Sequence, residues 1–381
     1  MRNILTVAAI LALGAGYVAC GAQGSSPGFE TDGGKTGSSS GGSGGSSGGS
    51  GGSSGGSGGS SGGSGGSSSG SSSGGSSGGA CTTNTGPITG SVGANGGSIS
   101  RLVFAVAGDT RPSMEDDVGG YPTAIITKIF QDIQAQTPTP VLTLGTGDYQ
   151  FSSTGSDATG SQMVDLYMTA RKGFTGAFFP AMGNHECGVS GSFTTSDNNN
   201  CGPGNAGGVT PNYTAFMTQM LAPISQTLPY YAINVSATDS SWTAKFVVTA
   251  ANSWSTAQAT WLQTTLAQKT TYTFVVRHEP SDATPPLPPG VAGVDAILPN
   301  YPYTLLIEGH NHTYGHYSDT PQEVVVGNGG APITAAGKDY GYALFSQRCD
   351  GAIVADEYDY MTGAADSEFH FVITPSGTLT Q

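Results

Sequence analysis

In the stretch Gly176-Ala177-Phe178-Phe179-Pro180-Ala181-Met182-Gly183-Asn184-His185-Glu186, an apolar run ends in three polar residues. The apolar part predicts a short buried strand, so an amide, an imidazole and a carboxylate would occupy the loop at its carboxyl end. Ligands of open α/β sheets bind at that end of the strands. A triplet of this kind taken alone is more often a turn than a site, so its meaning depends on the rest of the chain.

Four further apolar runs end in residues that bind metal ions. The runs and the polar residues after them are Leu102–Ala107 with Gly108-Asp109, Val141–Leu144 with Gly147-Asp148, Phe274–Val276 with His278, and Leu305–Ile307 with Gly309-His310-Asn311-His312. Carboxylates, amides and imidazoles are ligands of divalent metal ions. The five strand ends together predict a metal site; the alternative is a set of structural histidines and turns.

Periodic apolar residues predict alternating strands and helices after Arg101. The predicted helices cover residues 122–135, 163–170, 213–221 and 258–266. Further strands are predicted at residues 230–235 and 245–250, as antiparallel neighbours, and at 272–276, 303–307, 323–326, 342–347, 352–356 and 368–374. The Pro-rich segment 285–289 predicts a surface loop. Early β-α-β units followed by a β-rich tail predict an α/β fold of two mixed sheets packed face to face, with helices outside.

The first 80 residues differ in composition from the rest of the chain. Residues 1–20 predict a signal peptide, because the apolar run is shorter than the ~20 residues that span a membrane. Tyr17-Val18-Ala19-Cys20 resembles a bacterial lipobox, although Tyr17 is unusual there, so lipidation of Cys20 and plain secretion both stay open. Residues 21–80 predict a flexible Gly/Ser-rich linker, and residues 81–381 the folded domain.

Either interpretation of the N-terminus predicts export, as a cell-envelope lipoprotein or as a secreted protein. A membrane would then be contacted only through a lipid on Cys20. The net charge of the 381-residue chain is −14, and its few basic residues are not clustered. This charge pattern argues against nucleic acid as a partner.

The chain has five cysteines. If Cys20 carries lipid, four remain, and an even number in an exported protein suggests disulfides. Cys187 and Cys201 flank a loop directly after the Gly-Asn-His-Glu block, which predicts that they pair. Cys81 and Cys349 then pair by elimination. Metal ligation by cysteine is the weaker alternative, because no two cysteines are closely spaced.

The ordered blocks Gly-Asp, Gly-Asp, Gly-Asn-His-Glu, His and Gly-His-Asn-His resemble those of the calcineurin-like metallophosphoesterase superfamily, over about residues 101 to 335. Three features resemble its purple acid phosphatase-like branch: the amphipathic segment Gln258–Leu266, Tyr314 soon after the last His, and the Gly-rich run 327–332. The resemblance implies a four-layered α/β/β/α sandwich, in which two mixed β-sheets are flanked by helices.

The resemblance also implies a centre of two divalent metal ions, which would be zinc, manganese or iron. The implied ligands are Asp148 as the bridge, Asp109 and His312 on the first ion, and Asn184, His278 and His310 on the second. The nucleophile would be a hydroxide that bridges the two ions, because divalent cations lower the pKa of bound water towards ~7.

In the family, the His of the Gly-Asn-His-Glu block is not a metal ligand. The resemblance implies that His185 lies near the scissile phosphate and acts as a general acid. We expect Glu186 to fix the tautomer of His185 through a hydrogen bond, as carboxylate–imidazole pairs do. Tyr314 and His316 either line the substrate pocket or are packed structural residues, and His370 is predicted to be structural.

Two positions depart from the family pattern. Many members carry a His two residues after the first Asp, where this chain has Arg111, and a guanidinium stays protonated and binds metal poorly. Arg111 either binds phosphate oxygens in a bidentate fork or pairs with a carboxylate. Purple acid phosphatases carry a metal-bound Tyr three residues after the second Asp, where this chain has Phe151. The resemblance therefore implies a colourless protein.

The function that the resemblance implies is metal-dependent hydrolysis of small-molecule phosphate esters. Arg111 suits a terminal phosphate dianion, which favours monoesters over diesters. The alternative is a surface-tethered binding domain with impaired catalysis, in which Arg111 fills the first metal pocket. Retention of His185 together with the second set of ligands argues against that alternative.

Overall fold

The computed structural model describes residues 86–153, 157–188, 195–316, 320, 322–335 and 338–380. The chain divides into two units, Met1–Gly74 and Gly75–Gln381, and every described residue belongs to the second. The predicted signal peptide, the lipobox at Cys20, the Gly/Ser-rich linker and Cys81 lie outside the described residues. Among the helices that are described, none combines the length and the apolar character needed to cross a membrane.

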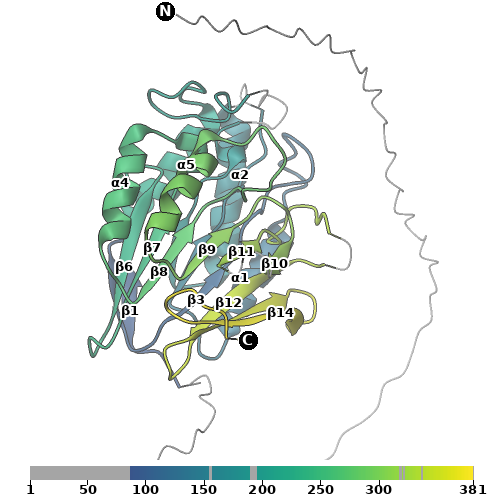
Figure 1. Cartoon of the computed structure of the whole chain (residues 1–381). Coiled ribbons are helices and arrows are strands. Elements are labelled where there is room, and N and C mark those ends of the chain that lie inside the picture. Colours follow the sequence, from purple (N-terminus) through teal and green to yellow (C-terminus); the bar gives the residue numbers. More distant parts are fainter. Residues whose placement is uncertain are drawn as a thin grey trace, which may run out of the picture. The chain divides into compact units, whose positions relative to one another are not determined.

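A six-stranded sheet carries the first three motif blocks (Figure 1). Its order is β14 (Ala365–Ile373), β13 (Ile353–Asp359), β12 (Gly341–Gln347), β3 (Val103–Val106), β4 (Leu142–Gly145) and β5 (Ala177–Pro180). The last three strands are parallel, and the first three pair in antiparallel fashion with each other and with β3. The parallel strands are continuous apolar runs because both faces of that part of the sheet are covered.

An eight-stranded sheet carries the other two blocks. Its order is β1 (Gly90–Gly93), β2 (Gly96–Ile99), β6 (Tyr231–Ala237), β7 (Thr243–Val248), β8 (Tyr272–Val276), β9 (Leu305–Glu308), β11 (Glu323–Val326) and β10 (Tyr314–His316). Strands β7, β8, β9 and β11 are parallel, whereas β6 and β7 are antiparallel neighbours, as predicted.

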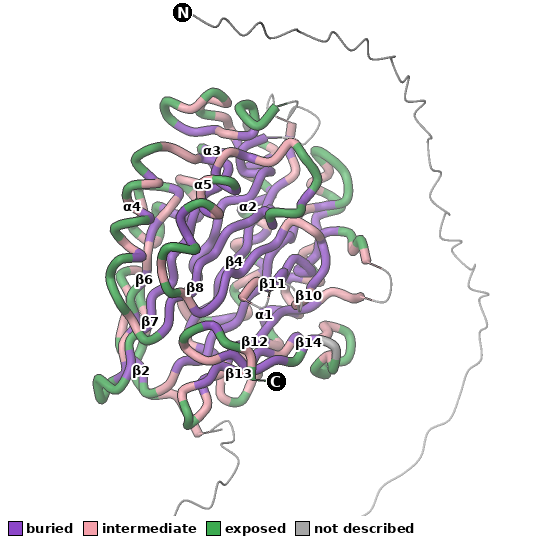
Figure 2. The backbone as a smooth tube through the Cα atoms, viewed as in Figure 1, coloured by how far each residue is buried: buried purple, intermediate pink, exposed green. Residues whose placement is uncertain are grey.

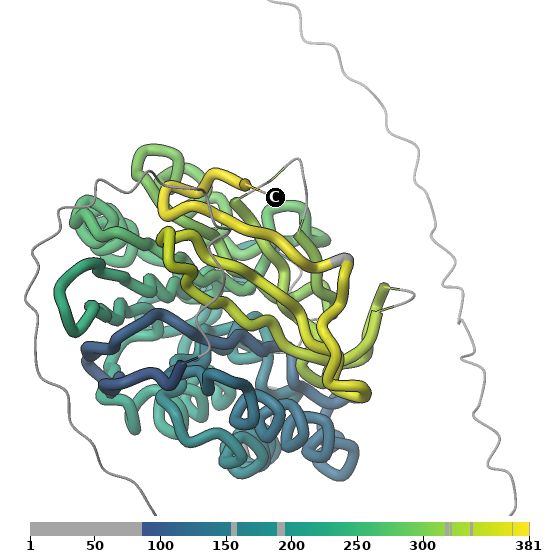
Figure 3. Tube along the Cα trace, turned by 90° about the horizontal axis from the view of Figure 1, so that it is seen from below, coloured from purple at the N-terminus to yellow at the C-terminus, as the bar shows by residue number. Residues whose placement is uncertain are grey.

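Helices cover the outer face of each sheet. The helices α1 (Thr123–Ala135) and α2 (Asp157–Ala170) lie on the six-stranded sheet, and α4 (Thr256–Ala267) and α5 (Pro289–Ile297) lie on the eight-stranded sheet. Figure 3 shows the blue to teal pair and the green pair on opposite sides of the two sheets. This arrangement confirms the predicted α/β/β/α sandwich. Other helical segments are α3 (Pro211–Ala215), the π-helical Phe216–Leu221, and short turns at Arg171–Gly173, Asn184–Glu186, Ala222–Ile224, Ala251–Ser253 and Leu298–Asn300.

Along the strands of the eight-stranded sheet, alternate residues belong to two apolar layers. In Figure 2 these strands are buried over most of their length, and exposed segments lie on the helices and loops around them. Val247, Val275 and Leu306 face α4 and α5, while the residues on either side of them face the other sheet. Between the sheets, the ring of Phe104 lies 5.0 Å from that of Phe246 and 4.9 Å from that of Phe274, measured between centroids. This buried interface holds the carboxyl ends of the two sets of parallel strands next to each other.

The sequence did not predict α5, β1, β2 or β10. The helix α5 follows a Pro-rich segment and contains Gly290 and Gly293, both of which lower helix propensity. A Cβ on Gly290 would collide with Ala251, and one on Gly293 with Trp254, so the helix packs too closely for larger residues. The predicted helix 213–221 is present, but it changes to π-helical geometry at Phe216.

The predicted Cys187–Cys201 disulfide is absent: both residues are free, buried thiols. Their side chains are hydrogen-bonded to each other, so the loop brings the sulfurs together as expected. Burial raises the pKa of the Cys201 thiol well above its usual value, which disfavours the thiolate needed for thiol–disulfide chemistry. Cys349 is disulfide-bonded, and Cys81, its predicted partner, is outside the described residues.

Candidate metal centre

The predicted ligands lie in loops at the carboxyl ends of parallel strands from both sheets. Asp109 follows β3, Asp148 follows β4 and Asn184 follows β5, while His278 follows β8 and the pair His310 and His312 follows β9. Backbone hydrogen bonds join these loops, from Asp109 N to Gly147 O at 2.9 Å and from Gly309 N to His278 O at 2.9 Å. The hydroxyl of Thr146 also donates to Val326 O at 2.9 Å, which connects the two sheets beside the site.

Four of the predicted ligands have a left-handed backbone. Their φ angles are 56° at Asp109, 58° at Asp148, 68° at His310 and 46° at His312. This conformation is unfavourable for residues with a Cβ, and backbone strain of this kind concentrates at functional sites. The strained positions therefore mark the same place in the fold as the sequence motifs do.

The ligand atoms form two groups that share one carboxylate. One group is Asp148, His278 and His310, and the other is Asp109, Asp148 and His312; within each, the candidate ligand atoms lie within 4.8 Å of one another. Asn184 adjoins the first of these groups, because its Oδ1 lies 3.1 Å from both His278 Nε2 and His310 Nδ1. The structure thus brings together all six residues whose ligation the sequence predicted.

Burial and charge at these residues fit divalent cations. The carboxylates of Asp109 and Asp148 are 0% and 1% exposed, and buried anions of this kind require positive charge nearby. Burial raises the pKa of Asp109 well above its usual value. Burial opposes ionisation of Asp148 too, but attraction to His278 and the hydrogen bond from it outweigh burial and lower the pKa of Asp148 well below its usual value. Two buried carboxylates, three imidazoles and one amide are a donor set suited to two ions.

Backbone carbonyls set the tautomers of two ligand histidines. His278 Nδ1 donates to Thr146 O at 2.8 Å, and His312 Nδ1 donates to Pro332 O at 3.0 Å. Since a carbonyl can only accept, each Nδ1 carries the proton and Nε2 is left as the donor atom for a metal. Burial also lowers the pKa of His310 to about 3 and that of His312 to about 4, which keeps both imidazoles in the neutral, metal-binding form.

Glycines in the motif blocks allow the loops to approach the carboxylates. A Cβ on Gly183 would collide with Asp148 Oδ1, and a Cβ on Gly309 would lie 2.5 Å from Asp109 Oδ2. Only glycine fits at these two positions while the carboxylates keep their places.

His185 lies beside Asp148, the carboxylate that the two groups share, and is 3% exposed. Its Nε2 is 3.7 Å from Asp148 Oδ2, its backbone N–H donates to Asp148 Oδ1 at 3.1 Å, and its Nδ1 has no hydrogen-bond partner among the described residues. Burial lowers the pKa of His185 to about 3, so the imidazole is neutral. The ring of Phe151 packs against it edge to face, with 4.6 Å between ring centroids.

Glu186 does not contact His185 in the way we predicted. Its Oε2 accepts from Asp148 N at 2.9 Å and Gly183 N at 2.8 Å, and its Oε1 accepts from Tyr149 N at 2.8 Å. The carboxylate therefore anchors the backbone of the Asp148 loop. Burial raises the pKa of Glu186 to about 7, and the charge of Asp148 raises it further in the same direction.

Arg111 extends into the site and contacts Phe151, the other residue that departs from the family pattern. Its guanidinium carbon lies 4.4 Å from the centroid of the Phe151 ring, and its Nε lies 3.8 Å from Asp148 Oδ2. One nitrogen, Nη1, donates to Pro112 O at 3.1 Å, whereas the buried Nε has no hydrogen-bond partner among the described residues. Both interpretations of Arg111 therefore keep a structural basis, since it approaches a carboxylate and also retains free donors.

A hollow of about 510 Å³ opens over the centre. Its lining consists of Arg111, Asp148, Asn184, His185, His310 and His312, together with Thr284, Asn311, Thr313 and Thr334. Asn311 and Thr313 belong to or follow the last motif block, but no sequence pattern indicates Thr284 or Thr334, which lie in irregular loops. Tyr314 and His316 instead pack on Phe369 and Phe371, respectively, and His370 pairs with Asp356, so these three residues have structural contacts.

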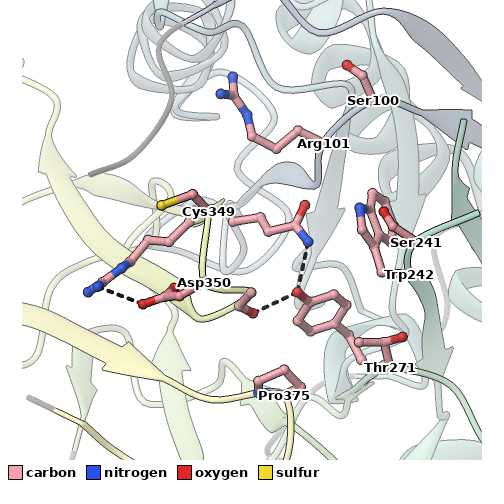
Figure 4. Close-up of a pocket in the computed structure, with 12 residues that line it drawn as sticks. Ser100, Arg101, Ser241, Trp242, Thr271, Cys349, Asp350 and Pro375 are labelled. Carbon is pink, nitrogen blue, oxygen red and sulfur yellow. Dashed lines mark hydrogen bonds and ion pairs between the residues drawn. The ribbon is translucent and has the colours of Figure 1, made fainter. Parts of the chain in front are cut away.

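A second hollow, of about 500 Å³, lies at the opposite ends of the strands (Figure 4). It is lined by residues that precede or begin β3, β7 and β8, among them Arg101, Trp242 and Tyr272. Gln347 Nε2 donates to the Tyr272 hydroxyl at 2.8 Å, which donates to Gly351 O at 2.7 Å. None of the motif residues lines this hollow.

Comparisons with known proteins agree with the motif blocks. The family model described as calcineurin-like phosphoesterase matches residues 102–314, which is more than half of the chain. No curated protein sequence matches the chain.

Among solved structures, the chain is similar to a purple acid phosphatase from yellow lupin (Lupinus luteus) seeds, with 16% identity and a TM-score of 0.51. That match covers 74% of this chain but only 55% of the lupin chain. A dimetal phosphatase from Danio rerio gives 13% identity, a TM-score of 0.47, and coverage of 72% and 99% of the two chains. GAP50, the anchor in the inner membrane complex of Plasmodium, has 13% identity and a TM-score of 0.46, and the match covers 73% of this chain and 90% of GAP50.

At such identity, the lupin structure bears on the fold alone, and it shares the two mixed sheets with flanking helices. The family model rests on the sequence itself and spans the region from β3 to β10, which holds every predicted ligand. This chain belongs to the calcineurin-like phosphoesterase family.

Proposed function

We propose that the chain hydrolyses phosphate esters at a centre of two divalent metal ions. The observation that carries the proposal is the pair of ligand groups that share Asp148. A shared carboxylate is what holds two ions close together, and paired ions of this kind act on the attacking and leaving oxygens of a phosphoryl group. Family membership supports the same reaction class.

The ligand assignment follows the two groups. Asp109 and His312 would hold the first ion, Asn184, His278 and His310 the second, and Asp148 both. When bound, the ions would supply activation of water and neutralisation of phosphate charge. Zinc, manganese and iron all suit these ligands, and the absence of a phenolate at Phe151 leads us to expect a colourless protein with any of them.

His185 is proposed as the general acid. It lines the hollow next to Asp148, and its Nδ1 is free of competing hydrogen bonds among the described residues. The imidazole can stabilise the departing ester oxygen through a hydrogen bond, and it can give up a proton once the negative charge of a bound phosphate raises its pKa; general acid catalysis is typically worth ~10²–10⁴ in rate.

Arg111 is proposed to bind the non-bridging oxygens of the substrate phosphate. Arg111 lines the hollow beside Asp148, and its buried Nε has no hydrogen-bond partner among the described residues. A guanidinium forms a bidentate fork best with a phosphate that has two free oxygens and a full dianionic charge. Monoesters are therefore the favoured substrates, and small-molecule monoesters would fit a hollow of about 510 Å³.

The N-terminal sequence supports the further proposal that this activity is exported. A lipid on Cys20 followed by a Gly/Ser-rich linker would tether the domain outside the cytoplasm, where it could release phosphate from organic esters. Without the lipid, the protein would be secreted.

The test is hydrolysis of a chromogenic phosphate monoester and the matching diester by the full mature chain. The assay is run after loading with zinc, manganese or iron, and with a chelator as control. We expect metal-dependent turnover, faster with the monoester, and a loss of about 10²–10⁴ in kcat for His185→Ala with metal content unchanged. A folded, metal-loaded chain without turnover would contradict the proposal and favour a tethered binding domain.

A further inference from the structure

Among the described residues, no side chain lies within hydrogen-bond distance of the His185 imidazole or of the Arg111 guanidinium, although both approach Asp148 Oδ2, at 3.7 and 3.8 Å. Glu186 accepts hydrogen bonds from backbone amides instead, and Arg111 Nη1 donates to Pro112 O. Both side chains also contact one aromatic ring, that of Phe151. We propose that Phe151 is a positioning residue that holds the imidazole and the guanidinium in place on either side of Asp148; this inference rests on the function proposed above.

The two contacts differ in kind, one between a cation and the ring and the other between two rings. The guanidinium carbon of Arg111 lies 4.4 Å from the ring centroid, a distance at which a cation is attracted to the face of an aromatic ring. The ring of His185 lies 4.6 Å away at an interplanar angle of 68°, which is an edge-to-face arrangement. One rigid side chain thereby limits the rotation of both polar groups.

The backbone of Phe151 is fixed on both sides. Its N–H points to Met163 Sδ of α2 at 3.2 Å, and its carbonyl accepts from Asp116 N at 2.8 Å. Ser153 N also donates to Asp116 Oδ1 at 2.9 Å. Asp116 follows Arg111 in the same loop, so the segment that carries the guanidinium is bound to the segment that carries the ring.

Hydrogen bonds from Asn212 connect the Phe151 segment to His185. Asn212 Nδ2 of α3 donates to Ser152 O at 3.0 Å and to His185 O at 3.1 Å, and Gln150 Nε2 donates to Asn212 O at 2.9 Å. The ring, the guanidinium and the imidazole are therefore carried by three loops that hydrogen bonds connect through Asp116 and Asn212. The ring can keep its place while the two polar groups act on a ligand.

An aromatic ring has an advantage over a carboxylate in this position. Asp148 Oδ2, at 3.8 Å from Nε, is too far away to accept a hydrogen bond from Arg111, whereas a carboxylate within hydrogen-bond distance would accept its N–H donors and leave fewer of them for an anion. A ring attracts the guanidinium but accepts none of its five donors in a strong hydrogen bond. Likewise it restrains His185 without engaging Nδ1 or Nε2. Phe151 positions both groups and leaves their donors free for phosphate.

The experiment compares Phe151→Leu, Arg111→Ala and the double variant, all metal-loaded. Leucine keeps an apolar side chain but removes the ring. Binding of inorganic phosphate is measured by calorimetry, and metal content and Tm are measured alongside. We expect Phe151→Leu to weaken phosphate binding about tenfold in the wild-type background and to have a clearly smaller effect when Arg111 is already alanine, because only the contact with His185 then remains.

Phe369→Leu serves as the matched control, because Phe369 is buried and contacts Tyr314 and Phe371 but touches neither polar group. It is expected to lower Tm while phosphate affinity stays unchanged. An equal loss of phosphate affinity from Phe151→Leu in both backgrounds, or a loss of bound metal, would overturn the proposal.

Kinetics give a second readout. If the ring positions His185, Phe151→Leu should slow an alkyl phosphate, which needs a proton on its leaving group, more than a nitrophenyl phosphate, which does not. Equal slowing of both esters would count against the role at His185. Absence of turnover in the unaltered chain would refute the proposed function but not this inference. The phosphate affinities of the single and double variants would still measure the contact between Phe151 and Arg111.

Discussion

Arg277 and Glu308 form a buried ion pair directly behind the strand ends that carry two of the ligand histidines. Arg277 Nη2 lies 2.6 Å from Glu308 Oε1, and the side chains are 0% and 2% exposed. Arg277 precedes His278, and Glu308 lies two residues before His310. The same guanidinium bonds Val291 O at 3.2 Å and Asp295 Oδ1 at 2.5 Å, so α5 takes part in the arrangement.

Glu308→Gln is expected to lower the free energy of unfolding by ~1–3 kcal/mol, because the amide is a weaker hydrogen-bond acceptor for the buried Arg277 guanidinium, which keeps Asp295 as a charged partner. Thermal unfolding at fixed metal concentration measures this. The matched control is Asp132→Asn, which breaks the exposed Lys128–Asp132 pair and should change stability by less than ~1 kcal/mol. Equal changes in the free energy of unfolding for the two variants would show that the buried pair stabilises the fold no more than the Lys128–Asp132 pair does.

Glu186→Gln tests the anchoring role that replaces our expectation of a contact with His185. An amide has one acceptor oxygen, so at least one of the three N–H groups from Gly183, Asp148 and Tyr149 would lose its partner. We expect a loss of ~1–3 kcal/mol in stability and weaker metal binding through the Asp148 loop. Calorimetry and metal titration measure both. A variant with normal metal affinity but a shifted pH–rate profile would instead support a direct effect on His185.

Glu357 makes stability depend on pH. It is 0% exposed, and burial, aided by the charges of Asp366 and Asp359, raises its pKa to about 8 from the 4.5 of an unperturbed Glu. The hydrogen bond from Asn328 and the charge of Lys338 act in the opposite direction. Because the folded state prefers the protonated carboxyl, this contribution is complete below pH 4.5 and is lost as pH rises through 8.

Glu357→Gln removes that dependence, since an amide does not titrate. Relative to the unaltered chain, the variant should gain ~2–4 kcal/mol in unfolding free energy between pH 5 and pH 9. Urea unfolding at several pH values gives the difference. A constant difference across this range would mean that Glu357 titrates normally in the folded protein.

Metal removal should destabilise the fold as well as abolish turnover. Asp109 and Asp148 are buried, and the ions would bind the folded state only, so metal at ~100 times its dissociation constant adds ~2.7 kcal/mol. A chelator is therefore expected to lower Tm, and metal to restore it. An unchanged Tm with metal demonstrably removed would contradict the assignment of these carboxylates.

The proximity of the six predicted ligands could be foreseen because each lies after an apolar run, and parallel strands bring their carboxyl ends together. The role of Glu186 was not predictable in the same way. Asn184–Glu186 forms a 3₁₀ turn, in which neighbouring side chains point about 120° apart, so Glu186 is directed away from His185. Adjacent residues looked like partners in the sequence and are separated by the turn.

The contact between Arg111 and Phe151 is a second feature that could not be predicted from the sequence. Each was identified from sequence as a departure from the family pattern, but they are far apart in the chain and nothing in either stretch links them. Their contact depends on the hydrogen bonds around Asp116, which only the folded loops create. Thr284 and Thr334 escaped prediction for the same reason, as they reach the hollow from irregular loops.

The left-handed backbone at four ligands has a practical consequence for anyone making an inactive reference protein. Alanine at Asp109 or Asp148 would remove the carboxylate and also place an unfavourable residue at φ angles of 56° and 58°. Asparagine tolerates this conformation far better and has nearly the same shape. Asp109→Asn and Asp148→Asn are thus the substitutions that separate the chemistry of the site from the geometry of its loops.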